Sequence, residues 1–485
     1  MKWTNKTMKL FIAHKAPVIL ATGPKSTKLL MVTTFSLLLV PCADNGLASA
    51  GAKMNLRDPN LEIEVLAELE GEWPTAMAFL GQDDILVLSQ QGTIYRILNG
   101  KLLENPLLEL EVDSGGEGGL LGIAVTKQPE EGNKEERQVF LYYTEKEART
   151  NDDCQGGECE IDERIFNRVY KYELKDGRLT NGSKLVEIPV GWDAPDPEMA
   201  NKHFGGAITI GPDNNVYFVT GDAGNCWDEG SCQIAINSGF LAAQTANDRE
   251  GEKPLGKGGI LYLTQDGEPV DNLLGDEYPL NLYYAYGIRN SFGLDFDPVT
   301  GNLWDAENGP YFGDEINLVE PGFNSGWAKI QGEWIIRDYT HLKPTDPIKG
   351  YHYSSSTDED DTELEDFDGK GTYSAPEFVW NSSVGVTSLK FFDSDALGKE
   401  YENDMFVGTF HGLLFDFDLD EERRNFTLQE PLTDKVANSD DEMNSIIFGS
   451  GLGAITDIEV GPDGNLYLAT LAGEVLKIVA KDKGG

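Results

Sequence analysis

The chain has 485 residues, of which 40% are hydrophobic, and a formal net charge of −44 at pH 7. This apolar content excludes wholesale disorder, and the length is sufficient for a sizeable core. A surface with so large an excess of acidic residues repels the phosphates of nucleic acids and anionic lipids, so nucleic-acid binding is excluded as a function.

The first fifty residues differ from the rest, because they carry six lysines and a single acid, Asp44. An apolar stretch over residues 29–40 follows, too short to cross a ~30 Å hydrocarbon core, and the segment ends in Ala48-Ser49-Ala50. We expect residues 1–50 to be a secretory signal, placing the protein in the periplasm or outside the cell. The alternative is membrane attachment, through a retained anchor or lipidation at Cys42. Removal of the segment would change the net charge from −44 to −49.

From about residue 61 onward, short apolar strands alternate with turns rich in Gly, Asp and Asn. Such turns, each followed by a strand, begin near residues 82, 211, 297 and 461. Gly and Asn tolerate the positive φ that tight hairpins need. The intervals of 129, 86 and 164 residues are close to three, two and four times the ~42 residues of a four-stranded propeller blade. The pattern predicts one all-β domain over residues 61–480, a β-propeller.

Two insertions interrupt this pattern, at residues 145–165 and 357–369. The second is strongly acidic and is either a calcium loop or a solvated excursion. Four cysteines remain if Cys42 is removed, and in an exported protein they predict two disulfides, with a four-thiolate zinc site as the alternative. They form two close pairs, Cys154 with Cys159 and Cys226 with Cys232.

The segments that carry candidate chemistry are rich in glycine and polar residues, whereas P-loop, zinc-protease and serine-hydrolase motifs are absent. Glycines permit close approach of the backbone to a flat ligand, so one His and one Arg among them predict a redox pocket. A structural histidine is the alternative. The segments are residues 115–122, 203–206, 286–294, 307–315 and 322–327.

In this order, the segments resemble the glucose/sorbosone dehydrogenase family, which includes soluble glucose dehydrogenases and aldose sugar dehydrogenases dependent on pyrroloquinoline quinone (PQQ). The similarity runs from about Trp73 to Ile478 and is strongest over residues 286–327, with the elements R-N-x-x-G-L, E-x-G-P, G-D-E and N-x-G-W. It implies a six-bladed β-propeller with PQQ on its top face and a Ca²⁺ ion. The implied reaction oxidises an aldose sugar to its lactone, by hydride transfer from the anomeric carbon to the quinone, with an external electron acceptor.

The resemblance also implies roles for individual residues. His203 matches the catalytic base, and imidazole suits proton abstraction near neutral pH. Arg289 and Asn290 match residues that hold the quinone oxygens, where a guanidinium stabilises developing negative charge. The backbone carbonyls of Gly309 and Pro310 match the protein ligands of Ca²⁺, which prefers oxygen donors. Three further side chains match positions that contact cofactor or substrate: Glu117, Thr387 and His411.

The chain departs from the family where the carboxylates of PQQ are bound. Family members usually carry R-x-R-D before the last strand pair, and here Ala454 and Thr456 replace both arginines. His411 stands at a lysine position, and Phe292 where many members have Gln. PQQ carries three carboxylates, and each charge-assisted hydrogen bond contributes roughly 1.5–3 kcal/mol. We therefore expect PQQ to bind more weakly than in typical members.

Two other functional classes remain open. One is a non-catalytic exported propeller that serves as a binding or cell-surface module, which the missing arginines favour, because a fold does not fix a function. The other is a propeller hydrolase of the lactonase type that uses calcium and carboxylates. Sugar oxidation after addition of PQQ and Ca²⁺ separates the dehydrogenase from both.

Overall fold

The computed structural model describes residues 53–127, 136–150, 161–190, 202–224, 246–247, 255–335 and 364–481, without the side chains of 148–150 and 161–163. The predicted signal segment, both cysteine pairs and residues 357–363 of the acidic insertion lie outside this part. Within it, helical structure is confined to α2 (Asp440–Met443) and the 3₁₀ turns η2 (Leu280–Leu282), η4 (Lys399–Tyr401) and η5 (Leu432–Asp434). None of these helices is long and apolar enough to span a membrane.

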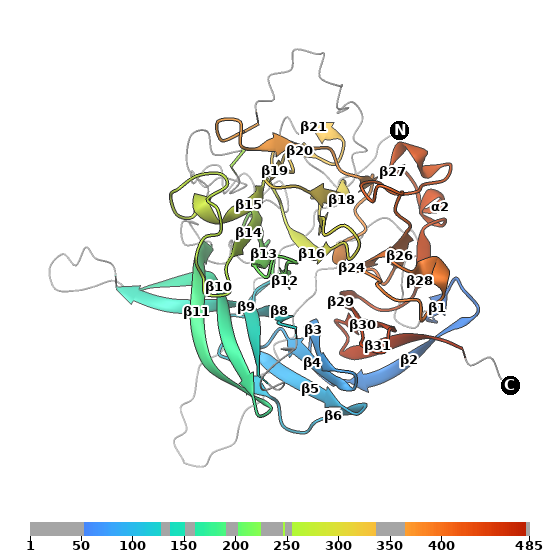
Figure 1. The fold of residues 1–485 in the computed structure, drawn as a ribbon, viewed down its shortest axis with the longest axis horizontal. Coiled ribbons are helices and arrows are strands. Elements are labelled where there is room, and N and C mark those ends of the chain that lie inside the picture. Colours follow the sequence, from blue (N-terminus) through green and yellow to red (C-terminus); the bar gives the residue numbers. More distant parts are fainter. Residues whose placement is uncertain are drawn as a thin grey trace, which may run out of the picture. The chain divides into compact units, whose positions relative to one another are not determined.

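Six sheets of four to six strands surround a common centre, and we number them as blades 1 to 6 (Figure 1). Blade 1 contains β3 (Pro74–Gly81), β4 (Asp84–Ser89), β5 (Thr93–Leu98), β6 (Lys101–Leu102) and β7 (Leu108–Glu109). Blade 2 contains β8 (Leu120–Val125), β9 (Arg137–Thr150), β10 (Ile161–Lys175) and β11 (Arg178–Val190). Blade 3 contains β12 (Ile208–Ile210), β13 (Val216–Thr220), β14 (Gly259–Leu263), β15 (Tyr283–Tyr286), β19 (Phe323–Asn324) and β22 (Thr372–Tyr373).

The second half of the chain forms the other three blades. Blade 4 contains β16 (Ser291–Phe296), β17 (Leu303–Glu307), β18 (Asp314–Val319), β23 (Phe378–Trp380) and β27 (Val436–Ala437). Blade 5 contains β24 (Val386–Phe391), β25 (Met405–Thr409), β26 (Leu414–Phe417), β28 (Ile447–Ser450) and the N-terminal β1 (Asn55–Leu56). Blade 6 contains β29 (Ile455–Val460), β30 (Leu466–Thr470), β31 (Glu474–Ala480) and β2 (Leu61–Glu68). A separate hairpin joins β20 (Ile330–Gln331) to β21 (Trp334–Ile335).

The ring of blades is closed. Each inner strand contacts the next in the order β3, β8, β12, β16, β24 and β29, and β29 contacts β3 again. Blade 6 combines both ends of the domain, because β2 pairs antiparallel with β31, with Leu61 opposite Ala480. Closure leaves short, protected edges instead of long free ones. The predicted six-bladed, all-β propeller is confirmed.

The blade length inferred from the turn spacing is wrong. The turns near residues 82, 211, 297 and 461 all connect the inner strand to the second strand, in blades 1, 3, 4 and 6. The intervals therefore span two, one and two blades, not three, two and four. The error came from assuming a uniform blade of ~42 residues. Strands of 13 to 15 residues in blade 2 and long inserted segments make the real blades longer.

Apolar side chains pack between neighbouring blades. Between blades 4 and 5, for example, the rings of Trp380 and Phe415 lie 5.2 Å apart, and those of Phe378 and Phe417 lie 5.0 Å apart. Central strands such as β13 and β30 are buried along their whole length because both faces meet another blade. Such strands read as continuous apolar runs rather than as alternation.

A partly buried ionic group, which we call the Lys390 cluster, also ties blades together near the axis. It comprises Asp295 on β16, Lys390 on β24, and Asp457 and Glu459 on β29. Lys390 Nζ lies 3.0 Å from Glu459 Oε2 and 3.7 Å from Asp295 Oδ1. The Asp457 carboxylate accepts a 2.6 Å hydrogen bond from the backbone N–H of Met77 on β3. The cluster therefore links four consecutive blades, including the pair that closes the ring.

Candidate functional site

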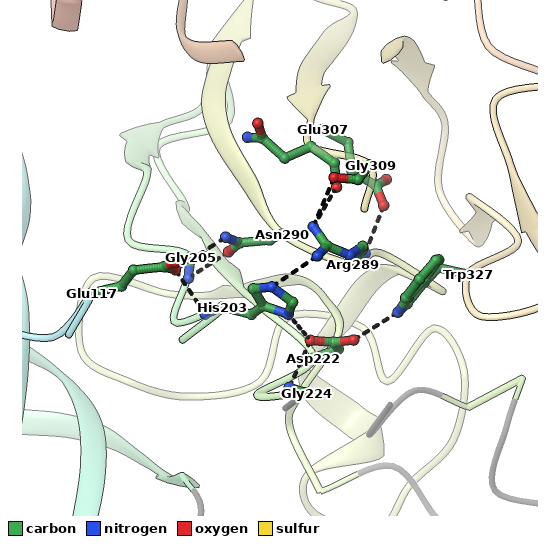
Figure 2. Close-up of polar contacts among 11 residues, drawn as sticks. Glu117, His203, Gly205, Asp222, Gly224, Arg289, Asn290, Glu307, Gly309 and Trp327 are labelled. Atoms are coloured by element: carbon green, nitrogen blue, oxygen red, sulfur yellow. Dashed lines mark hydrogen bonds and ion pairs between the residues drawn. The ribbon is translucent and has the colours of Figure 1, made fainter. Parts of the chain in front are cut away.

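The predicted catalytic residues meet because the chain enters every inner strand from the same face. His203 precedes β12, Arg289 and Asn290 precede β16, and Glu117 precedes β8. These entries belong to the adjacent blades 2, 3 and 4, so residues far apart in the sequence form one cluster (Figure 2).

His203 is held by Asp222, which follows β13. The His203 Nδ1 lies 2.6 Å from Asp222 Oδ1. The same carboxylate accepts hydrogen bonds from the Gly224 N–H at 2.8 Å and the Trp327 indole N–H at 2.6 Å. Burial alone would raise the pKa of Asp222, but the nearby His203 side chain, its hydrogen bond, the Arg289 charge and the Gly224 N–H outweigh it and lower the pKa. An ionised Asp222 only accepts hydrogen bonds, so Nδ1 carries a proton and Nε2 is left as the basic nitrogen.

Arg289 faces that basic nitrogen. Its NH2 lies 3.0 Å from His203 Nε2, and its NH1 donates to the carbonyls of Asn308 at 3.0 Å and Gly309 at 3.1 Å. The guanidinium lies over the ring of Trp327, 5.4 Å from its centroid. Arg289 is only 8% exposed, and its buried Nε has no hydrogen-bond partner within the described residues. A buried donor without a partner is costly, so this atom is suited to receive an acceptor from a ligand.

Glu117 and Asn290 support the backbone around His203. The carboxylate of Glu117 accepts hydrogen bonds from the His203 N–H at 2.7 Å and from the Asn290 amide at 3.3 Å. The Asn290 side-chain oxygen accepts the Gly205 N–H at 3.1 Å. His203 adopts a left-handed conformation with φ of 57°, which is uncommon for residues other than glycine. These contacts hold it there.

The predicted calcium ligands lie beside Arg289. The Gly309 N–H donates to Asp314 Oδ1 at 2.9 Å, which fixes the turn. A side chain at Gly309 would place its Cβ 1.8 Å from the carbonyl oxygen of Phe312, so only glycine fits. No group of three or more His, Cys, Asp or Glu side chains among the described residues is arranged to hold a metal. The calcium-binding role of the Gly309 and Pro310 carbonyls stays a prediction.

Buried acids lie directly behind this turn. Burial raises the pKa of Glu315 to about 7, and burial together with neighbouring carboxyls raises the pKa of Glu307 well above its usual range. The Ser325 hydroxyl lies 2.7 Å from a Glu307 oxygen and 2.8 Å from a Glu315 oxygen. One hydroxyl hydrogen cannot serve two carboxylates, so one of these carboxyls is protonated and donates to Ser325. The other Glu307 oxygen accepts the Arg289 backbone N–H at 2.6 Å.

A cavity of about 390 Å³ opens beside this cluster on the propeller axis. Glu117 lines it on one side, and Thr387 lines it from β24. The departures from the family pattern, Phe292 and Thr456, line it too. His411, in contrast, lies exposed on the turn between β25 and β26, with its ring centroid 5.9 Å from that of Phe410. None of the contacts around His203 involves His411, so its cofactor-binding role stays a prediction.

Sequence reasoning missed Asp222 and the contribution of Trp327. Asp222 had a recognisable signal, since it directly follows the apolar strand Val216–Thr220 and stands between small residues. A carboxylate at a strand end beside glycines is a typical position for a functional side chain. The pairing with His203 could not be read from the sequence, because it joins two different connections of blade 3.

Comparisons with known proteins agree with this architecture. Residues 71–477 match the family model described as glucose/sorbosone dehydrogenase. The chain is 26% identical over 454 residues to the aldose sugar dehydrogenase YliI of Escherichia coli, covering 91% of this chain and 98% of that one. It is 30% identical over 231 residues to quinoprotein glucose dehydrogenase B of Acinetobacter calcoaceticus, covering 46% and 42%.

A solved structure supports the fold. The soluble aldose sugar dehydrogenase of Escherichia coli, in its apo form, superposes with a TM-score of 0.57 at 21% identity, covering 87% of this chain and all of that one. The family model spans most of the chain and includes every predicted site residue. The chain therefore belongs to the glucose/sorbosone dehydrogenase family.

Proposed function

We propose that the chain catalyses the PQQ- and calcium-dependent oxidation of an aldose sugar to its lactone. The observation that carries this proposal is the contact between His203 and Arg289 in one buried cluster. The histidine has its Nδ1 held by a carboxylate, and the arginine has a buried Nε without a partner in the described structure. The family match supports a sugar dehydrogenase in particular.

The roles of the side chains follow from this geometry. His203 Nε2 takes the proton of the hydroxyl on the anomeric carbon while the hydride leaves that carbon. The Asp222 carboxylate then stabilises the imidazolium, because it accepts the Nδ1–H at short range. Arg289 places positive charge where negative charge develops on the hydride acceptor. When bound, PQQ supplies that acceptor and Ca²⁺ supplies a Lewis acid.

The residues at this end of the site fit such a cofactor. The unused Arg289 Nε offers a donor to a quinone oxygen, and the Gly309 carbonyl retains a second lone pair beside its bond from Arg289. The Gly309 and Pro310 carbonyls are oxygen donors of the kind that Ca²⁺ prefers. At the other end, Ala454 and Thr456 supply no cation for carboxylates.

The test is sugar oxidation by purified protein supplied with PQQ, Ca²⁺ and a dye acceptor, over a panel of aldoses. We expect His203→Ala to lower kcat by at least ~10²-fold without loss of the folded circular dichroism spectrum, as removal of a general base does. Unchanged turnover in this variant would exclude His203 as the base.

If the unmodified protein binds the cofactor and oxidises none of the sugars, the second candidate function replaces the first. That candidate is an exported, non-catalytic propeller that serves as a binding or cell-surface module, and the neutral residues Ala454 and Thr456 favour it. The dehydrogenase proposal includes an exported location and an external electron acceptor. The non-catalytic candidate also requires export but no electron acceptor. N-terminal sequencing of the mature protein tests whether residues 1–50 are removed.

A further inference from the structure

The axial cavity has two distinct walls. The inner strands follow one another around the ring, so β12, which follows His203, stands across the axis from β29. Glu117 and Gly205 line the cavity on the side of the catalytic cluster, and both hydrogen-bond to it. Thr387, Phe410 and Thr456 line it from blades 5 and 6. We call these three residues the far wall.

The charges around the cavity oppose a polyanionic ligand. Among the described residues that line it, Glu117, Asp457 and Glu459 are acidic and Lys390 is the one base. Lys390 is already held between Glu459 at 3.0 Å and Asp295 at 3.7 Å. The positive charge of Lys390 is therefore compensated within the protein and is not available to a ligand. Carboxylates brought into this cavity would meet like charges, which is unfavourable even after partial screening by salt.

The far wall offers neutral groups instead. The Thr456 hydroxyl is buried and has no hydrogen-bond partner within the described structure, so it can donate to a ligand oxygen. The Thr387 hydroxyl donates to the Ile455 carbonyl and retains its acceptor capacity. Phe410 is 50% exposed and lines the cavity, so its ring is available to a ligand. An aromatic face with hydroxyls suits a flat and uncharged ring system.

We propose that this cavity accepts the flat ring of the cofactor, with the quinone end toward the adjoining cluster of His203 and Arg289, but does not bind its carboxylates. The protein would then hold an uncharged pyrroloquinoline-type orthoquinone more tightly than PQQ itself. This inference rests on the function proposed above and concerns which form of cofactor the chain accepts.

The test compares PQQ with its trimethyl ester, which keeps the ring and the orthoquinone but removes all three negative charges. Each is titrated into the full-length protein with Ca²⁺ present, and binding is measured by calorimetry, independently of turnover. We expect the ester to bind at least about tenfold more tightly. Added salt should strengthen PQQ binding by screening repulsion, whereas binding to a site built on ion pairs would weaken.

Two variants locate the preference. Ala454→Arg combined with Thr456→Arg should reverse the preference for the ester, because the added positive charges raise the affinity for PQQ and lower the relative affinity for the ester. Phe410→Ala should weaken both ligands, because it removes the exposed ring. Trp73→Ala is the matched control, since Trp73 is exposed to a similar extent, 46%, and does not line the cavity. It should change neither affinity.

The outcomes separate this inference from the proposed function. Binding of PQQ by the unmodified protein as tightly as the ester, or more tightly, overturns the inference, and so does binding of neither ligand. Sugar oxidation is then assayed with each ligand at saturation. Turnover with tightly bound PQQ would leave the proposed function standing while the inference fails. Preference for the ester without any turnover would support the inference while the proposed function fails.

Discussion

Substitution of Lys390 by Met tests whether the ionic cluster on the axis stabilises the closed ring. The two carboxylates nearest to the ammonium lie at 3.0 and 3.7 Å. With an effective dielectric constant of about 20, these contacts correspond to roughly 5 kcal/mol of attraction each before the cost of desolvation. Removal of one partner of a buried ion pair typically costs about 3–5 kcal/mol, because the remaining charges lose their compensation. The side chains of Lys390 and Glu459 stay 23% and 26% exposed, so solvent screens part of the attraction. We therefore expect Lys390→Met to lower the free energy of unfolding by about 2–3 kcal/mol near pH 8, at or just below the lower end of this range.

The loss should shrink as the pH falls. Burial alone would lower the pKa of Lys390, but Asp295 and Glu459 outweigh it and raise the pKa, so the lysine stays charged. Burial also raises the pKa values of Asp295, Asp457 and Glu459. A carboxyl whose pKa is raised by folding contributes stability below its unfolded pKa, and this contribution is lost as the pH rises through the folded pKa. Without Lys390 these values rise further, so protonation near pH 5.5 relieves the repulsion.

The assay is urea unfolding followed by tryptophan fluorescence at about pH 5.5 and about pH 8. Lys399→Met is the matched control, because Lys399 is exposed in η4, which connects β24 and β25 of the same blade. It should change stability by less than about 0.5 kcal/mol at either pH. A loss for Lys390→Met below about 1 kcal/mol, or one that is equal at both pH values, would refute the reasoning.

Three further predictions concern the site and the cysteines. Asp222→Asn should lower kcat by about 10²- to 10⁴-fold, because an amide donating to His203 Nδ1 moves the imidazole proton to Nε2; a rate within threefold of the unmodified enzyme would contradict this. Near pH 6, Glu315→Gln should leave the free energy of unfolding within about 1 kcal/mol of the unmodified protein. The variant should gain stability relative to the unmodified protein as the pH rises above about 7, because the raised pKa of Glu315 contributes stability only at lower pH; unfolding curves at both pH values that show a constant difference would contradict this. Non-reducing mass spectrometry of the exported protein should show four hydrogens fewer than in the reduced form, and four free thiols or bound zinc would exclude disulfides at Cys154, Cys159, Cys226 and Cys232.

The propeller architecture could be predicted from local sequence patterns, although the number of blades could not. Asp/Asn/Gly turns at regular places mark where inner strands end, and they predicted a propeller correctly. The number of residues between them did not give the number of blades, because inserted segments and the long strands of blade 2 carry no periodic signal. The six-bladed count came from family resemblance, and ring closure confirms it.

Part of the candidate site could also be predicted from local sequence patterns. Short glycine-bracketed motifs can be recognised one at a time, and the structure brings Glu117, His203, Arg289 and Asn290 into direct contact. His411 was assigned from its resemblance to a lysine position of the family, and it lies outside that cluster. The role of each of these residues in catalysis or cofactor binding stays a prediction.

The sequence by itself determined the strand-rich composition, the acidic surface, the turns and the chemical types available at each strand entry. Only the tertiary structure decided that Asp222 orients His203, that Arg289 keeps a buried donor unused, and that Lys390 is enclosed by acids from neighbouring blades. The physical reason is that turn and strand preferences depend on a few adjacent residues. Contacts across a propeller axis depend on how far each blade is rotated and displaced, which is fixed only when all six pack together and the ring closes.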